Sequence, residues 1–268
     1  MMKKNALQKY WPLYLLTTGI AFMLRCFSKI TDSDVILWML TPTVRWVSIL
    51  SGISFEYLPH RGYVSYFYRF LVAPSCAGIR FMMIAFLMQS FSFLYRIEKR
   101  RNGYLWFGFC VVFSYIATIF VNGIRIIASI YLPLLLERPG MADGFMTSDR
   151  QHTLIGTGVY FSSLCFLYLL SAFICKKWFQ DTAKPASGAA VPACDFRPRR
   201  MFVPAFWYLL TVIGLPFCKR ILTKDWEGFW PYAMLVIFTC LPVCALLYAA
   251  DRLRYRISGD EGTGGTAR

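Results

Sequence analysis

Three polar side chains of this chain stand where apolar runs meet loops, and together they carry the groups needed for acyl transfer. They are Cys76, Arg125 and His152. A thiol is a nucleophile, a guanidinium stabilises negative charge, and an imidazole exchanges protons near neutral pH. Because polar groups in apolar helices usually serve a function, the three residues indicate cysteine-based acyl transfer or peptide cleavage at a membrane surface.

Cys76 lies at the predicted start of a helix, since Pro74 suits a first helical turn and an apolar run follows at once. A free thiol has a pKa of about 8.5, and a helix N-terminus or a nearby cation increases the small ionised fraction at neutral pH. A continuous helix would place Arg80 one turn from Cys76 on the same face. The alternative is that Cys76 is a small apolar residue beside a proline cap.

Arg125 has apolar residues on both sides and therefore needs a partner. Its fixed cation would hold a thiolate ionised or stabilise the oxyanion of a tetrahedral intermediate. Asn122, three residues earlier on the same helical face, is a candidate supporting residue. The alternative is an arginine whose long side chain reaches the lipid headgroups.

His152 opens an apolar run after the polar loop 137–151. Imidazole is the natural general acid or base at neutral pH, and Gly156, one turn further on, would let a neighbouring helix or a substrate backbone approach closely. The alternative is an interfacial histidine without a catalytic role. His60 has no comparable context and is interpreted as a surface residue.

Composition predicts an integral membrane protein. Of 268 residues 57% are hydrophobic and 18% aromatic, with a mean hydropathy of +0.48, which exceeds what a water-soluble domain needs. The net charge of +15 comes from short basic stretches beside apolar runs. Such stretches are typical of anchors to anionic lipid, so we expect membrane lipids as partners and no nucleic acid.

The cysteine and histidine content indicates neither a metal nor a cofactor. Nine cysteines occur without a CxxC pair, and several lie inside apolar runs, where thiols behave as small hydrophobic groups. With two histidines in the chain and no HExxH sequence, counting excludes a histidine-rich metal centre.

We predict an all-α fold with about six transmembrane helices in a single membrane domain, 1–268. The catalytic core covers about 35–175, a basic linker covers 176–201, and two further helices follow in 202–250. A helix needs about 20 apolar residues to cross about 30 Å of hydrocarbon. The runs that qualify are 10–29, 76–95, 104–123, 153–175, 202–219 and 229–250.

Basic clusters orient the predicted spans. Those at 96–101, 176–200 and 252–256 are cytoplasmic by the positive-inside rule, which places Cys76, Arg125 and His152 on the outer face of the cell membrane. The run 35–50 carries Pro42 and Arg45, and an arginine at the bilayer centre costs about 3 kcal/mol. We therefore expect a re-entrant or interfacial helix at 35–50, followed by an external β-like segment at 53–73.

Three short patterns occur in order at predicted outer helix ends: Cys-x-Gly at Cys76 and Gly78, Asn-x-x-Arg at Asn122 and Arg125, and His-x-x-x-Gly at His152. With the lead-in around Thr41-Pro42 and Phe55-Glu56, they resemble the exosortase/archaeosortase family over about 35–175. The short length is similar to that of smaller members such as the exosortase K type. One departure is Ala77, where the usual family sequence has serine.

The resemblance implies a membrane-embedded cysteine protease and transpeptidase. Its substrates would be exported proteins with a C-terminal motif, one transmembrane helix and a basic tail. Cys76 matches the nucleophile, Arg125 the essential arginine and His152 the histidine, and no cofactor is implied. The main alternative is a transporter or channel, because polar residues in apolar helices also mark ion and solute pathways. No inverted repeat, the usual mark of a transporter, is visible in the sequence.

Overall fold

The computed structural model describes residues 8–29, 32–136, 148–179 and 199–263, and these are mostly helical. By internal contacts the chain divides into two compact units, Met1–Thr182 and Ala183–Arg268, which are described separately. The division falls within the linker predicted at 176–201, much of which lies outside the described residues. The expectation of a single membrane domain stays a prediction.

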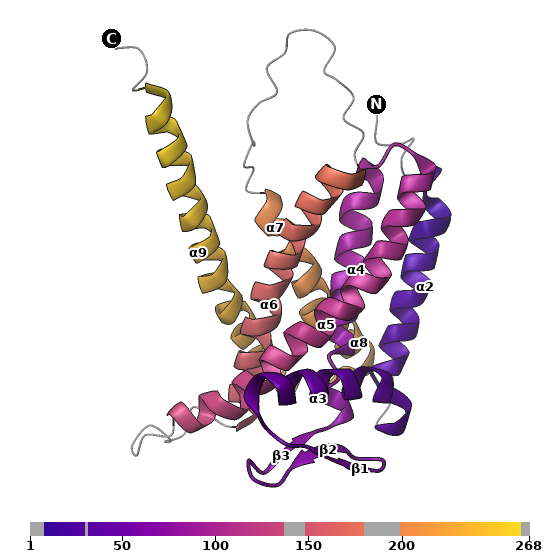
Figure 1. Cartoon of the computed structure of the whole chain (residues 1–268), viewed down its shortest axis with the longest axis vertical. Coiled ribbons are helices and arrows are strands. Elements are labelled where there is room, and N and C mark those ends of the chain that lie inside the picture. The colour runs from indigo at the N-terminus through magenta and orange to yellow at the C-terminus, as the bar shows by residue number, and fades with distance from the viewer. Residues whose placement is uncertain (1–7, 30–31, 137–147, 180–198, 264–268) are drawn as a thin grey trace. The chain divides into compact units, whose positions relative to one another are not determined.

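Helix α4 is the centre of the first unit and packs against α2, α5 and α6 (Figure 1). In its most apolar stretch 83% of the residues are buried, against 33% in α5 and 39% in α6. The end of α4 that begins near Cys76 is therefore enclosed by protein on several sides. The helices of this unit are α2 (Trp11–Phe27), α4 (Ile79–Phe93), α5 (Arg100–Leu136) and α6 (Ser148–Ile174), with short helical turns η3 (Leu94–Arg96) and η4 (Cys175–Phe179).

Five helical stretches are long and apolar enough to cross a membrane, and they overlap five of the six predicted spans. The remaining predicted span, 10–29, forms the shorter apolar helix α2 of 17 residues, about 25 Å long at 1.5 Å per residue. The five stretches are Pro74–Arg96, Arg100–Pro133, Arg150–Phe179, Phe202–Thr223 and Phe229–Ala250.

Helix α5 is longer than predicted, and this corrects the expected position of Arg125. We expected the span to end near residue 123, but the helix continues through Leu136. The apparent break at Gly123 has a packing cause: a Cβ there would lie 2.5 Å from Cδ1 of Trp46, so glycine permits close approach of another segment. Asn122 and Arg125 consequently lie inside a helix and not at its end.

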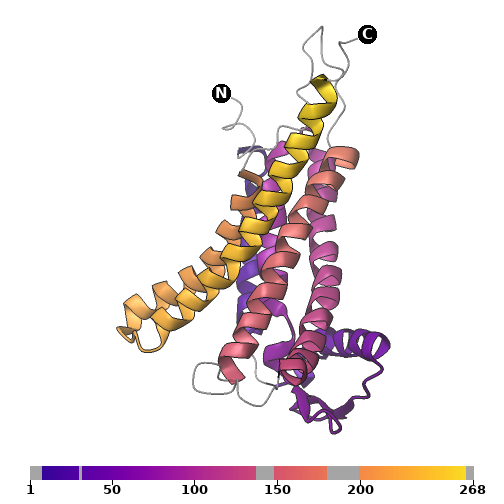
Figure 2. The ribbon, with the colours of Figure 1, turned by 90° about the vertical axis from the view of Figure 1, so that its left-hand side faces the viewer.

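Helix α3 (Leu37–Ser51) lies across one end of the helices of the first unit in both ribbon views (Figures 1 and 2). Its 15 residues are too few to cross a bilayer, and it packs against α5. Pro42 inside the helix has no N–H to give to the carbonyl of Trp38. The hydroxyl of Tyr115 on α5 donates to that carbonyl instead, at 2.9 Å.

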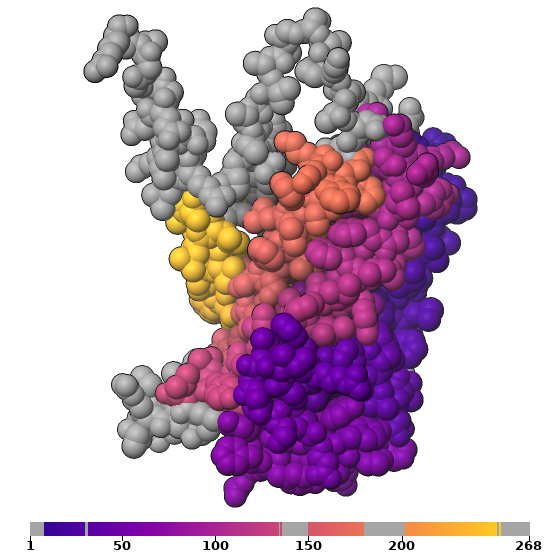
Figure 3. Space-filling model, in the orientation of Figure 1, coloured from indigo at the N-terminus to yellow at the C-terminus, as the bar shows by residue number. Residues whose placement is uncertain are grey.

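The segment after α3 forms a three-stranded antiparallel sheet, which confirms the β-like segment predicted at 53–73. Strand β1 (Glu56–Leu58) pairs with β2 (Gly62–Ser65), and β2 pairs with β3 (Phe70–Val72). Short turn η1 (Asp34–Ile36) precedes α3, and η2 (Pro74–Cys76) follows β3. The violet region of the space-filling view shows this part of the chain as a continuous layer at one end of the first unit (Figure 3).

The second unit contains two long apolar helical stretches. The first consists of α7 (Arg199–Leu209), a π-helical segment η5 (Leu210–Gly214) and α8 (Leu215–Thr223) in succession. Lys224 ends it in a left-handed conformation, with φ of 56°. The second is α9 (Phe229–Thr263), which contacts α7.

Candidate active site

Cys76 ends the short turn η2, immediately before α4. Its backbone N–H donates to the carbonyl of Ala73 at 2.8 Å, and its side chain is buried, with 8% exposure. Gly78 then adopts a left-handed conformation with φ of 76° and caps α4. Cys76 therefore precedes the positive end of the helix dipole, and a nearby anion is favoured at that end.

The break at Gly78 corrects the expected relation between Cys76 and Arg80. We expected one continuous helix with both residues on one face, but the left-handed glycine separates the turn of Cys76 from α4. Arg80 is exposed, although it interacts electrostatically with Tyr160. It is therefore a peripheral charge near the site.

Gly78 also allows α5 to approach the turn that carries Cys76. A Cβ at Gly78 would lie 3.0 Å from Cγ of Asn122 and 3.0 Å from Cγ2 of Thr118. Asn122 is fully buried, and its Nδ2 donates to the backbone carbonyl of Cys76 at 2.6 Å. The predicted supporting residue thus holds the peptide group that follows the candidate nucleophile.

Arg125 lies between the other candidate residues. Its Nη2 donates to Nε2 of His152 at 2.9 Å, its Nη1 donates to the hydroxyl of Tyr160 at 3.3 Å, and its guanidinium is close enough to the thiol of Cys76 to interact with it electrostatically. The structure therefore brings Cys76, Arg125 and His152 together around one guanidinium.

The three described partners of Arg125 include no carboxylate. A half-buried guanidinium whose partners among the described residues are all uncharged favours any anion that forms beside it, because burial weakens the screening by water. A Cys76 thiolate or the oxyanion of an acyl intermediate is such an anion. The arrangement can thus stabilise negative charge at the thiol.

The contact with Arg125 also defines the state of His152. A guanidinium has N–H donors and no acceptor, so Nε2 of His152 must accept and its proton must be on Nδ1. In this geometry the imidazole is neutral and has a basic nitrogen directed into the site. Most of the polar loop predicted before His152, residues 137–147, lies outside the described residues.

Gly156 lies against the guanidinium from α6. A Cβ at this position would be 3.2 Å from Nε of Arg125, and that Nε is buried without a hydrogen-bond partner. The absence of a side chain therefore lets the arginine lie flat on the backbone of α6. This assigns a packing reason to the predicted importance of Gly156.

Tyr160 belongs to the site and was missed in the sequence. Its hydroxyl donates to Oδ1 of Asn122 at 2.7 Å, and its ring lies 5.2 Å below the guanidinium carbon of Arg125 and stacks on Phe81 at 5.0 Å. The sequence signal was the spacing, because His152, Gly156 and Tyr160 follow one another at intervals of four residues on one helical face.

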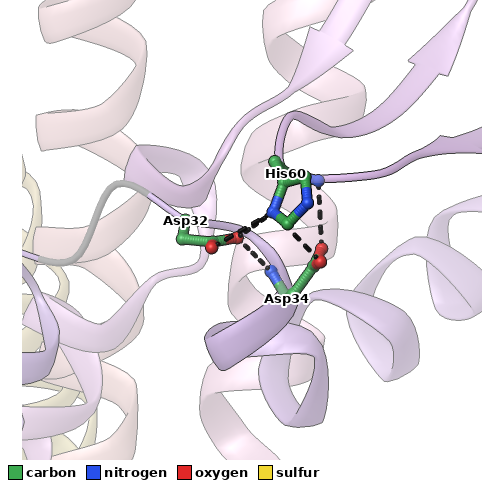
Figure 4. A group of neighbouring side chains, drawn as sticks. All are labelled: Asp32, Asp34 and His60. Atoms are coloured by element: carbon green, nitrogen blue, oxygen red, sulfur yellow. Dashed lines mark hydrogen bonds and ion pairs between the residues drawn. The ribbon is translucent and has the colours of Figure 1, made fainter.

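A second polar cluster joins the turn between β1 and β2 to the segment before α3 (Figure 4). Nδ1 of His60 lies 3.2 Å from a carboxylate oxygen of Asp32 and 3.2 Å from one of Asp34. Asp34 also accepts hydrogen bonds from the hydroxyl of Tyr57 and the backbone N–H of His60. His60 is thus exposed, as predicted, but it is the centre of a surface ion-pair cluster that we call the hairpin latch.

The latch contains residue types that ligate divalent cations, and its candidate ligand atoms lie within 4.8 Å of one another. The pairing of the groups with one another accounts for their arrangement without an ion. The hydrogen bond with Asp32 and the charge of Asp34 raise the pKa of His60. The hydrogen bond from Tyr57 lowers the pKa of Asp34.

Comparison with models of protein families, with curated proteins and with solved structures finds no match to this chain.

Proposed function

We propose that the chain is a membrane-embedded cysteine endopeptidase and transpeptidase of the exosortase/archaeosortase type. The observation that carries the proposal is the guanidinium of Arg125, which contacts both the thiol of Cys76 and the imidazole of His152. A nucleophile, a proton acceptor and a charge stabiliser arranged around one point are the requirements of an acyl-enzyme mechanism.

In the proposed first step Nη2 of Arg125 turns away from Nε2 of His152, the thiol proton of Cys76 passes to the freed lone pair, and the sulfur attacks the substrate carbonyl. The imidazolium then has no lone pair to offer, so its hydrogen bond with Arg125 does not form again at this stage. The released Nη2–H of Arg125 then donates to the oxyanion. Transition-state stabilisation therefore begins at the moment when negative charge forms on the substrate oxygen.

In the second step the C–N bond breaks, and His152 returns the proton to the departing amine. The products are a thioester on Cys76 and a free C-terminal fragment. Water or an amine or hydroxyl acceptor from the cell envelope then attacks the thioester, with His152 as the base, and regenerates the thiol. This sequence balances in atoms and charge and requires no cofactor.

The proposed substrates are exported proteins with a short C-terminal motif, a transmembrane helix and a basic tail. We further propose that the chain spans the cell membrane about six times, with the site facing outward and α3 lying in the interface. The five long apolar helices and the short helix α3 support this arrangement. Because enzyme and substrate would be confined to one bilayer, the entropic cost of bringing them together would be lower.

The test compares the protein C-termini of host cells that carry either the unchanged chain or Cys76→Ala. We expect exported proteins to keep their C-terminal helix and basic tail in the variant cells. Equal membrane levels of the two forms control for folding. An unchanged set of C-termini, measured by mass spectrometry, would refute the proposed activity.

The predicted thioester offers a direct second test. Tryptic peptides that contain Cys76 should carry a substrate-derived mass, and hydroxylamine at neutral pH should remove it. The same treatment should find no adduct on Cys110, which is fully buried in α5. An adduct on neither cysteine under conditions of active processing would exclude the acyl-enzyme route.

A further inference from the structure

Among the described residues, the side chain of Tyr160 joins Arg125 and Asn122, the two residues that interact with Cys76. Arg125, which interacts electrostatically with the thiol, donates from Nη1 to the Tyr160 hydroxyl at 3.3 Å. That hydroxyl donates in turn to Oδ1 of Asn122 at 2.7 Å, and Asn122 donates from Nδ2 to the carbonyl of Cys76 at 2.6 Å. The hydroxyl thus accepts once and donates once.

The direction of these bonds is fixed by chemistry. Arginine has no acceptor, so the hydroxyl must accept from it and direct its own proton elsewhere. The hydroxyl proton goes to Oδ1 of Asn122, which leaves the amide N–H group of Asn122 facing the Cys76 carbonyl. A chain of donors in one direction is polarised at each step, and here it starts from a cation.

We propose that Tyr160 is a positioning residue that holds the guanidinium of Arg125 against the Cys76 thiol and, through Asn122, fixes the backbone of Cys76. The role assigned to Tyr160 in catalysis rests on the proposed function, but its effect on the thiol does not. The ring is held independently of the hydroxyl by its stack on Phe81 and by the cation above it.

Tyr160→Phe therefore removes one oxygen and keeps the ring. Without the hydroxyl, the buried amide oxygen of Asn122 loses its donor, and Arg125 loses the acceptor that directs its Nη1. Both the amide and the guanidinium then gain freedom to rotate away from Cys76. We expect the thiol to react more slowly and to need a higher pH.

Tyr168 supplies a matched control in the same helix. It is 3% exposed, its ring lies 5.3 Å from that of Phe93, and its hydroxyl interacts electrostatically with Arg96. Tyr168→Phe therefore removes the same atom from a similar arginine and phenylalanine environment. It measures the general structural cost of losing a buried hydroxyl from α6.

The experiment measures the rate at which iodoacetamide alkylates Cys76 in the full-length protein between pH 6 and pH 9, with each cysteine resolved by mass spectrometry. Arg125 on α5 and Tyr160 on α6 interact electrostatically with Cys76, and the ionisable groups next to these two are His152 on α6 and Arg80 on α4. We expect Tyr160→Phe to slow alkylation at pH 7 by about tenfold and to move the rate profile to higher pH. Tyr168→Phe should leave both unchanged.

Asn122→Ala provides a second variant that tests the same chain of bonds. Tyr160→Phe should slow alkylation less in the Asn122→Ala background than in the unchanged chain, because the part of its effect that passes through Asn122 is already lost. An unchanged profile in Tyr160→Phe, or an equal loss in Tyr168→Phe, overturns the proposal. A shifted profile in a protein that processes no precursor would refute the proposed function while the positioning role stands.

Discussion

Two arginine–tyrosine–phenylalanine clusters lie eight residues apart along α6, about 12 Å by helix rise. In the first, the guanidinium of Arg125 lies over the ring of Tyr160, which stacks on Phe81. In the second, Arg96 lies 5.0 Å above the ring of Phe93 and interacts electrostatically with Tyr168. Each cluster also has a buried cysteine, Cys76 in the first and Cys175 in the second.

The difference between the clusters lies in what surrounds each thiol. Cys76 precedes the N-terminus of α4, and the arginine beside it also contacts His152 and is linked to Asn122. Cys175 follows the C-terminus of α6, where the carbonyl ends of the helix disfavour an anion. An arginine thus lies near a cysteine in both clusters, and the clusters differ in the helix end next to the cysteine and in the presence of an imidazole.

Replacement of each arginine by lysine should separate the clusters most clearly. We expect Arg125→Lys to lower precursor processing by about 100- to 1,000-fold, because a compact ammonium cannot contact thiol, imidazole and phenol together. Arg96→Lys should change processing less than twofold. Processing is measured as the ratio of mature to precursor C-termini, and full activity of Arg125→Lys would contradict the proposed oxyanion role.

The intrinsic reactivity of the two thiols should differ in the unchanged protein. We expect iodoacetamide to alkylate Cys76 about 100-fold faster than Cys175 at pH 7, because Cys76 has both a cation and a helix N-terminus beside it. Arg125→Lys should reduce the ratio, and Arg96→Lys should leave it unchanged. Equal rates for the two cysteines would remove the distinction between the clusters.

The surface of α6 on which Arg125 lies can be altered without change to any polar group. Gly156→Ala places a methyl group 3.2 Å from Nε of Arg125, so the guanidinium must shift. We expect processing to fall by about tenfold or more, since small misplacements are costly at an active site. The control is Gly108→Ala in α5, where a Cβ meets nothing within 4 Å. Equal activity of the two variants would show that the guanidinium tolerates displacement.

The smallest effect concerns the hairpin latch, which holds the strands that lead to the first cluster. The raised pKa of His60 gives stability that is present below its usual pKa of 6.5 and is lost as pH rises through the raised value. The lowered pKa of Asp34 gives stability that is present above 3.8 and is lost as pH falls through the lowered value. The latch should therefore be complete between about pH 4 and pH 6.5.

Hydrogen exchange of the His60 amide, corrected for the intrinsic rate, measures how often the latch opens, because this amide donates to Asp34. We expect modest extra protection inside this window, because exposed ion pairs contribute little. His60→Asn keeps a residue that tolerates the left-handed backbone, at φ of 62°, but removes the titrating group. In this variant the protection of the amide at position 60 should no longer fall as the pH rises above the window. Identical profiles in both proteins would exclude a role for the imidazole.

The sequence was sufficient for much of the architecture, because apolar runs of about 20 residues have few alternatives to helices. The strands also followed from their aromatic and β-branched residues. The length of α5 could not be predicted in this way. Gly123 resembles a helix end in the sequence, but it is a glycine because Trp46, far away in the sequence, packs against it. Contacts between distant segments decide whether a glycine interrupts a helix or receives a neighbour.

The same limit applies to the site. Cys76, Arg125 and His152 stand out because each is unusual in an apolar context, whereas Tyr160 does not, since tyrosine is common in such helices. Its role depends on a hydroxyl placed between Arg125 and Asn122, which only coordinates reveal. Arg80 illustrates the opposite error, because a helical spacing argument fails when a left-handed residue intervenes.

The proline in α3 has a mechanical consequence. Because Pro42 leaves the carbonyl of Trp38 to be capped by Tyr115, and because Trp46 sits over Gly123, α3 is tied to α5 at two points. A shift of one helix alone would leave the carbonyl of Trp38 without its donor and would remove Trp46 from the backbone of Gly123. We therefore expect α3 and α5 to move together as a pair.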